Sequence, residues 1–358
     1  MPIDIENKLK SIMNTQKIKN LSLVLLSSIA IISCDDDENT DNPIIVDETI
    51  EIPEQIEFTN AGFYPEGIDY NNNTNDFFVG SVLQGEIGTI DPETGTYETF
   101  ITREDDPNLV SVTGIFTDED NNRLLAASGN PGLAGIDDSV AQVAYLGIYD
   151  LETAEVIAGI DLTLAFPEGQ AFVANDIAIG PNRNIFVTDS FSPVIYQVDG
   201  TTFEASVFIN GGDDFTPVPN GFGLNGLVYT NGNLIACKTD DGTLIRIPLD
   251  TPEDYQIVDI DMDFIGADGL ELTSEGDIVV VNNGFAGDAT GTYLLNSTDD
   301  WVSATVTAQD LVSSTATTFP TTATLAADGE IYAVNSYFSL LFAGDTSQET
   351  FSIVRANL

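Results

Sequence analysis

The sequence contains no histidine. A Ser-His-Asp triad, a Cys-His pair and a His-ligated zinc site are therefore excluded. Basic residues are also scarce: 10 Lys or Arg stand against 58 Asp or Glu, for a formal net charge of −48 at pH 7. Nucleic-acid binding needs a positive footprint, so we expect no nucleic-acid partner. Any chemistry must use carboxylates, amides, hydroxyls or an oxygen-ligated metal.

Cysteine occurs only twice, at Cys34 and Cys237. Four lysines and an apolar run, residues 21–32, precede Cys34, and the run is too short for a bilayer, which needs about 20 residues. A basic start followed by a short apolar run is typical of a secretory signal. Ser33-Cys34 resembles a bacterial lipobox, which predicts a signal peptide over 1–33, a lipidated Cys34, export and an outer-membrane anchor. The alternative is an ordinary signal with an incidental cysteine.

In the segment 34–43, four acidic residues, Asp35 to Glu38, directly follow Cys34. A charge run cannot bury apolar area, so we expect a disordered tether. Its position resembles the surface-export signal of Bacteroidetes lipoproteins, which implies exposure at the cell surface; a plain spacer is the alternative. Cys237 is left without an intrachain disulfide partner, and we expect it to be a small buried hydrophobe.

From residue 44 the chain consists of short runs of Val, Ile, Phe, Tyr and Thr separated by Gly, Asn, Asp and Pro, which indicates an all-β fold. One short motif recurs about every 50 residues, a spacing typical of propeller blades of four strands each. Its six copies are Glu66-Gly67-Ile68-Asp69, Thr113-Gly114-Ile115-Phe116, Asn175-Asp176-Ile177-Ala178, Asn225-Gly226-Leu227-Val228, Asp268-Gly269-Leu270-Glu271 and Thr322-Ala323-Thr324-Leu325. The sequence therefore predicts a six-bladed β-propeller over 44–358.

The third copy shows the unit most clearly, with strands predicted over 175–179, 185–188, 194–198 and 204–209. The fourth copy repeats it over 225–229, 234–238, 243–247 and 255–260. The sixth copy is one strand short after 351–355, so we expect an N-terminal strand, 44–52 or 55–58, to close the last blade and cover its free edge. This topology places the long connections 129–144, 211–224, 283–291 and 336–348 on the face that carries the motifs, where loops commonly bind ligands.

The first motif positions, predicted to be Glu66, Thr113, Asn175, Asn225, Asp268 and Thr322, should meet at one mouth of the central channel. Four of them offer carboxylate or amide oxygens, the ligands that hard divalent cations take. Taken one at a time, each residue equally suits a wet channel or a turn. Their common phase in four blades favours a metal site.

The chain resembles the senescence marker protein/gluconolactonase family over about residues 55–358. The resemblance is carried by Pro65-Glu66-Gly67, Asn175-Asp176-Ile177, Leu224-Asn225-Gly226 and Ala267-Asp268-Gly269-Leu270. The resemblance implies that Glu66, Asn225 and Asp268 hold a divalent cation and that Asn175 lies beside it, facing substrate. It also implies that the cation polarises a lactone or ester carbonyl and that Asp268 is the base for the attacking water. Ca²⁺ is the expected ion, with Mg²⁺, Zn²⁺ and Mn²⁺ as alternatives.

Two departures from the family bear on the substrate. Members that act on sugar lactones often carry Arg two residues before the Asn, where this chain has Val173, and Thr113 and Thr322 add no charge. Tyr337, Phe338 and Phe342 are candidates for apolar walls or for simple loop packing. The sequence thus predicts a metal-dependent hydrolase of a lactone or ester. The alternative is a non-enzymatic surface propeller that binds a ligand or partner and holds a structural metal.

Overall fold

The computed structural model describes residues 50–358 except 134, 137–140, 220, 285–289 and 314–316. By its contacts the chain divides into two units, residues 1–48 and residues 49–358. The predicted signal peptide, lipidated Cys34 and acidic tether lie outside the described residues. Within the described part of the chain, no helix has the length and apolar character needed to cross a membrane.

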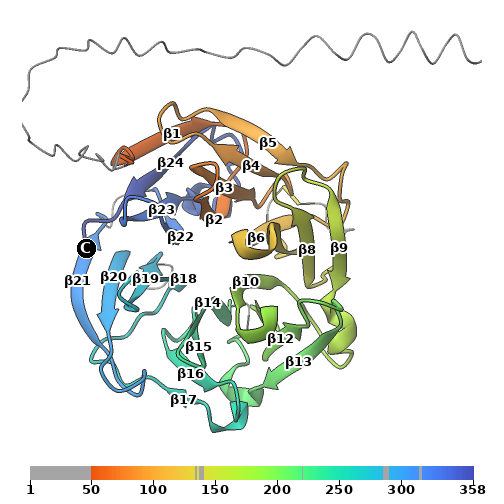
Figure 1. The fold of residues 1–358 in the computed structure, drawn as a ribbon, viewed down its shortest axis with the longest axis vertical. Coiled ribbons are helices and arrows are strands. Elements are labelled where there is room, and N and C mark those ends of the chain that lie inside the picture. Colours follow the sequence, from red (N-terminus) through yellow and green to blue (C-terminus); the bar gives the residue numbers. More distant parts are fainter. Residues whose placement is uncertain (1–49, 134, 137–140, 220, 285–289, 314–316) are drawn as a thin grey trace, which may run out of the picture. The chain divides into compact units, whose positions relative to one another are not determined.

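Residues 50–358 form a ring of six four-stranded antiparallel sheets, the predicted six-bladed β-propeller (Figure 1). Blades 1 to 3 comprise β2 (Pro65–Asn71), β3 (Asp76–Ser81), β4 (Ile87–Ile90), β5 (Tyr97–Ile101); β6 (Ser111–Asp118), β7 (Arg123–Gly129), β8 (Tyr145–Asp150), β9 (Val156–Asp161); and β10 (Ala174–Ile179), β11 (Ile185–Asp189), β12 (Val194–Val198), β13 (Ala205–Asn210). Blades 4 to 6 comprise β14 (Leu224–Thr230), β15 (Asn233–Lys238), β16 (Leu244–Pro248), β17 (Gln256–Ile257); β18 (Ala267–Leu272), β19 (Ile278–Asn282), β20 (Gly291–Asn296), β21 (Thr305–Leu311); and β22 (Pro320–Leu325), β23 (Ile331–Asn335), β24 (Thr350–Arg355), β1 (Gln55–Thr59).

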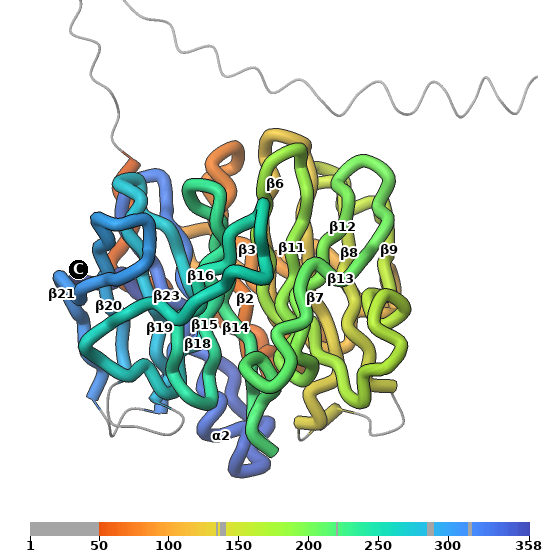
Figure 2. Tube along the Cα trace, turned by 90° about the horizontal axis from the view of Figure 1, so that it is seen from below, coloured from red at the N-terminus to blue at the C-terminus, as the bar shows by residue number. Residues whose placement is uncertain are grey.

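Short helices occupy some of the connections. Among the described residues one is α-helical, α2 (Phe338–Phe342), and the others are 3₁₀ turns: η1 (Glu119–Asn121), η2 (Leu162–Ala165), η3 (Pro181–Arg183), η4 (Gly212–Asp214) and η5 (Pro252–Asp254). Figure 2 shows the ring from its side, with α2 protruding from one face.

The N-terminal strand closes the ring. β1 pairs with β24 in antiparallel register from Gln55↔Val354 to Thr59↔Thr350. This confirms the second of the two closing strands predicted, 55–58. In blade 4 the outer strand β17 covers only Gln256–Ile257, shorter than the predicted 255–260.

The core lies between adjacent blades rather than inside any one of them. Six buried apolar clusters each draw residues from two neighbouring blades. Because side chains alternate across a strand, Phe77 of β3 enters the cluster between blades 6 and 1, whereas Phe78 enters the cluster between blades 1 and 2. Cys237 is fully buried in the cluster between blades 4 and 5, as predicted.

A β-bulge interrupts each innermost strand at the start of the motif. In blade 1 the register moves from Pro65↔Ser81 to Ile68↔Val79, which leaves one extra residue on β2. The same shift follows Val112, Ala174, Leu224, Ala267 and Pro320 in the other blades. A bulge re-aims side chains and is common beside functional sites. Here it sets the direction of the first two motif residues.

The second motif residue is glycine in four blades because adjacent inner strands approach closely at the bulge. A Cβ added to Gly226 would lie 2.5 Å from the carbonyl oxygen of Asp268, and one added to Gly269 would lie 2.7 Å from Cα of Thr322. This contact brings the first motif residues of neighbouring blades together.

Candidate functional site

The first motif residues line one small cavity of about 50 Å³ at a mouth of the channel. Glu66, Thr113, Asn175, Asn225 and Asp268 all contribute to it. All five are buried. The structure thus brings together the four predicted metal-site residues and Thr113.

The sixth predicted position is wrong by one residue. The register of β22 aligns Pro320 with Asn335 and Ala323 with Ala333, so Thr321, not Thr322, is the equivalent of Glu66. Thr321 is buried, and its hydroxyl donates to the carbonyl oxygen of Glu66 at 3.0 Å. Thr322 occupies the second motif position and lines a different cavity.

A second set of residues holds the side chains of the first motif residues in place. Each member of this set directly follows the second strand of its blade. From blade 1 to blade 6 they are Val82, Asn130, Ser190, Thr239, Asn283 and Ser336. Asn175 Nδ2 donates to Ser190 Oγ at 2.9 Å, and Asn225 Nδ2 donates to Thr239 Oγ1 at 3.0 Å. Asn283 Nδ2 donates to Asp268 Oδ2 at 2.8 Å. These supporting residues were not predicted; their signal is a polar residue directly after the second strand in five of the six blades.

In blade 1 the supporting position holds Val82, whose side chain can neither accept nor donate a hydrogen bond. Oε2 of Glu66 is buried and has no hydrogen-bond partner among the described residues. Burial raises the pKa of Glu66 well above its usual range, and the charges of Asp268 and Asp176 raise it further. An unpartnered buried carboxylate oxygen is costly unless a proton or a cation satisfies it.

The carboxylate of Asp268 is held on both oxygens. Asn225 Nδ2 donates to Oδ1 at 2.6 Å, and Asn283 Nδ2 donates to Oδ2. Burial raises the pKa of Asp268 to about 7, and the two amide donors act in the opposite direction. Among the described residues no group of three or more His, Cys, Asp or Glu side chains could hold a metal ion. The predicted set of metal ligands does not depend on such a group, because it combines two carboxylates, those of Glu66 and Asp268, with the amides of Asn175 and Asn225.

The predicted loops do border this mouth. Pro131 and Leu133 come from the β7–β8 connection and Phe222 from the β13–β14 connection. Phe338 and Phe342 of α2 complete the apolar wall, the first of the two roles that the sequence left open for them, with Phe319 beside them. Tyr337 instead packs against Phe351, with ring centroids 5.9 Å apart. Val173, two residues before Asn175, is also part of the wall.

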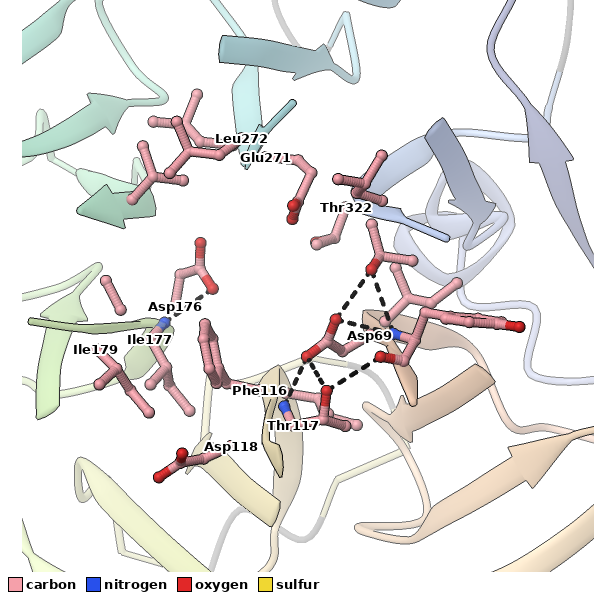
Figure 3. A pocket seen from close by; sticks show the side chains of 18 of the residues that line it. Asp69, Phe116, Thr117, Asp118, Asp176, Ile177, Ile179, Glu271, Leu272 and Thr322 are labelled. Atoms are coloured by element: carbon pink, nitrogen blue, oxygen red, sulfur yellow. Dashed lines mark hydrogen bonds between the residues drawn. The ribbon is translucent and has the colours of Figure 1, made fainter. Parts of the chain in front are cut away.

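A larger cavity of about 520 Å³ is lined by residues further along the same inner strands. Asp69, Asp176 and Glu271 point into it (Figure 3). Burial raises the pKa of all three, that of Asp176 to about 7. These acids were not predicted as a group, although all three lie within the motif copies.

Two of these acids hold neighbouring blades together. Asp69 accepts from the backbone N–H of Thr117 at 2.6 Å in blade 2 and from the hydroxyl of Thr324 at 2.9 Å in blade 6. Asp176 accepts from the backbone N–H of Leu227 at 2.7 Å in blade 4. Their hydrogen bonds give Asp69 and Asp176 a structural role in the propeller.

No protein-family model and no curated protein sequence matches the chain. Solved structures do. The Malassezia sympodialis allergen Mala s 1 is 18% identical with a TM-score of 0.65, over 86% of this chain and 97% of that one. A gluconolactonase from Xanthomonas campestris is 10% identical with a TM-score of 0.55, over 84% and 89% of the two chains. Regucalcin from Agrobacterium tumefaciens, described as a calcium-binding protein, is 14% identical with a TM-score of 0.52, over 82% and 90%.

At these identities the comparisons establish a shared fold. The chain is a six-bladed β-propeller, an architecture it has in common with structures of gluconolactonase and regucalcin. Membership of the senescence marker protein/gluconolactonase family stays a prediction.

Proposed function

We propose that this propeller is a divalent-cation-dependent hydrolase of a lactone or ester, of the senescence marker protein/gluconolactonase kind. The observation that carries the proposal is the set Glu66, Asn175, Asn225 and Asp268, buried around one cavity with Oε2 of Glu66 left unpartnered. Two carboxylates and two amide oxygens suit a hard cation, and Ca²⁺ tolerates the irregular geometry best. Two bacterial proteins of the same fold, a gluconolactonase and a calcium-binding protein, support the same function.

In this proposal Glu66, Asn225 and Asp268 hold the cation, and Asn175 lies beside it. A bound divalent cation would supply Lewis-acid polarisation of the substrate carbonyl. Asp268 accepts a proton from the attacking water. The water oxygen bonds to the carbonyl carbon, the carbon–oxygen bond of the ester breaks, and the proton passes to the leaving oxygen.

The surrounding residues serve this chemistry by holding groups still. Asn225 and Asn283 fix both oxygens of Asp268, so the base keeps one orientation. Ser190 fixes the amide of Asn175, whose second N–H and carbonyl oxygen would contact substrate.

The test combines calorimetric titration of Ca²⁺, Mg²⁺, Mn²⁺ and Zn²⁺ with turnover of a panel of lactones and aryl esters. We expect saturable binding of at least one ion and turnover that chelation removes. Asp268→Ala should abolish turnover, whereas Thr113→Ser, at an uncharged position of the same cavity, should retain metal binding. Ion binding without turnover of any substrate would favour the ligand-binding alternative. Failure to bind any ion would disprove the site.

We further propose that the mature protein is exported and anchored through lipid on Cys34 to the outer membrane, exposed at the cell surface. The acidic tether and the large negative charge support a solvent-facing domain. Cys34→Ala should move the protein from the membrane fraction to the soluble fraction, and mass spectrometry of the N-terminal peptide should lose the acyl mass. Membrane retention of this variant would overturn the anchor.

A further inference from the structure

The apolar side chains around the small cavity indicate which substrates it can accept. Around the buried polar residues the wall is apolar and is built from side chains of five connections between strands: Val82, Leu133, Phe222, Phe319, Phe338 and Phe342. A volume of about 50 Å³ admits only a small group, such as the carbonyl end of a substrate. The remainder of any substrate must therefore lie along these apolar side chains.

Three of the aromatic rings form one cluster at the mouth. The ring centroids of Phe319 lie 5.8 Å from those of Phe338 and 5.7 Å from those of Phe342, and Phe338 and Phe342 are 5.9 Å apart. Phe338 is buried, but Phe342 is 42% exposed. The packing of α2 onto the propeller explains why Phe338 is buried, but it does not explain why Phe342 is exposed. Phe222 lies elsewhere on the wall and pairs with Phe191 at 5.4 Å.

The described side chains that line the cavity offer no positive charge to an anionic ligand. Among the described residues that line the cavity, the charged ones are Glu66 and Asp268, and no Lys or Arg is present. Hydroxyl groups of a sugar laid against Val173 and the phenylalanines would lose water without gaining hydrogen bonds, which is unfavourable. A hydrocarbon group in the same place would gain from burial.

We infer that the substrate is an uncharged ester or lactone whose hydrocarbon part, alkyl or aryl, lies on Phe222 and on the Phe319, Phe338 and Phe342 cluster. This inference rests on the proposed function and names its substrate class. The carbonyl enters the cavity between Glu66 and Asp268, and the hydrocarbon remains at the mouth.

The experiment compares kcat/KM for p-nitrophenyl esters from acetate to hexanoate, and for γ-lactones with increasing alkyl chains, with kcat/KM for glucono-δ-lactone, all at saturating metal. We expect kcat/KM to rise by about fourfold for each methylene that reaches the aromatic cluster. Phe342→Ser and Phe319→Ser should flatten this dependence while metal affinity stays unchanged. Ile257→Ser, which removes a 62% exposed side chain from the outer strand β17, is the matched control and should leave the dependence intact.

Higher kcat/KM for glucono-δ-lactone than for every alkyl lactone would overturn the inference while leaving the proposed hydrolase standing. If the protein binds metal but hydrolyses nothing, the hydrolase fails, and the apolar site is tested separately with the neutral dye Nile red. Dye binding that Phe342→Ser and Phe319→Ser abolish supports an apolar ligand at this mouth. Dye binding that neither variant alters overturns it.

Discussion

The side-chain amide of Asn225 donates to Oδ1 of Asp268 at 2.6 Å, joining blade 4 to blade 5 at the channel mouth. The other oxygen of Asp268 accepts from Asn283. Two amides therefore hold one buried carboxylate, and its orientation does not depend on a bound ion. Glu66, with Val82 in the supporting position, has no such arrangement.

Replacing Asn283 should weaken metal binding without removing a proposed ligand. Asn283→Ala leaves Oδ2 of Asp268 without its donor, so the carboxylate holds its proton more tightly and loses its fixed orientation. Loss of an outer-shell partner typically costs 10–100-fold in metal affinity, and we expect about that increase in Kd by calorimetry.

Asn357→Ala is the matched control, because Asn357 also donates to an aspartate, Asp310, but at an exposed place far along the chain. Its Kd should equal that of the wild type. Equal affinity for Asn283→Ala and wild type would show that Asn283 does not position Asp268.

Replacing Glu66 should stabilise the metal-free protein and weaken metal binding. Glu66→Gln removes a buried carboxylate whose Oε2 has no partner among the described residues, so in EDTA at pH 8 the variant should be more stable by about 1–3 kcal/mol. It should also lose the gain that the ion provides, about 2.7 kcal/mol at a concentration one hundred times Kd. Urea unfolding with and without metal measures both effects.

Glu98→Gln, on the exposed face of β5, serves as the control and should change neither quantity. A Glu66→Gln protein that is less stable than wild type in EDTA would indicate that the carboxylate has a structural partner.

The sequence was sufficient to predict six blades, because the motif repeats with a fixed phase and its third residue is apolar in most copies. It also predicted which residues meet around the cavity, since the bulge gives the first motif residue one direction in every blade. The strands of blade 3 were predicted to within one residue at each end, where turn residues mark both ends.

The rest depended on register, which residue types do not reveal. Thr321 and Thr322 are chemically identical, so the sequence could not say which one faces Glu66; the pairing of Pro320 with Asn335 decides it. The support of Asp268 by Asn283 joins two strands of one blade across a bulge, which shifts the partner by a residue that no turn signal marks.

Stability of the metal-free protein should rise as the pH falls from 8 to 5. Burial raises the pKa of Asp176 and Asp268 to about 7 and that of Asp189 to about 6, from an ordinary value of 3.8. The folded state therefore holds protons that the unfolded chain releases between pH 3.8 and about 7. The stability gained from these protons is complete below the pKa of the unfolded state. It is lost as the pH rises through the pKa of the folded state, at about 1.4 kcal/mol per pH unit for each proton.

Thermal unfolding in EDTA at pH 5, 6, 7 and 8 measures this slope. Asp176→Asn should flatten it, because the amide cannot titrate but its oxygen can still accept from the N–H of Leu227. A midpoint that increases from pH 5 to pH 8 would contradict the raised pKa values.

Closure of the ring should depend on Phe58 in β1. Its side chain is 1% exposed and contacts three aromatic rings, those of Phe63, Tyr97 and Phe351, with centroids 6.1, 6.2 and 5.8 Å away. These rings belong to both ends of the described chain, so Phe58→Ala opens a cavity where blade 6 meets blade 1 and should cost about 3–5 kcal/mol. Urea unfolding measures the loss, with Ile257→Ala on the solvent side of β17 as the control, expected within about 0.5 kcal/mol of wild type. A cost below about 1 kcal/mol for Phe58→Ala would mean that the Phe58 side chain contributes little to closure, and that β1 closes the ring through its backbone pairing with β24 alone.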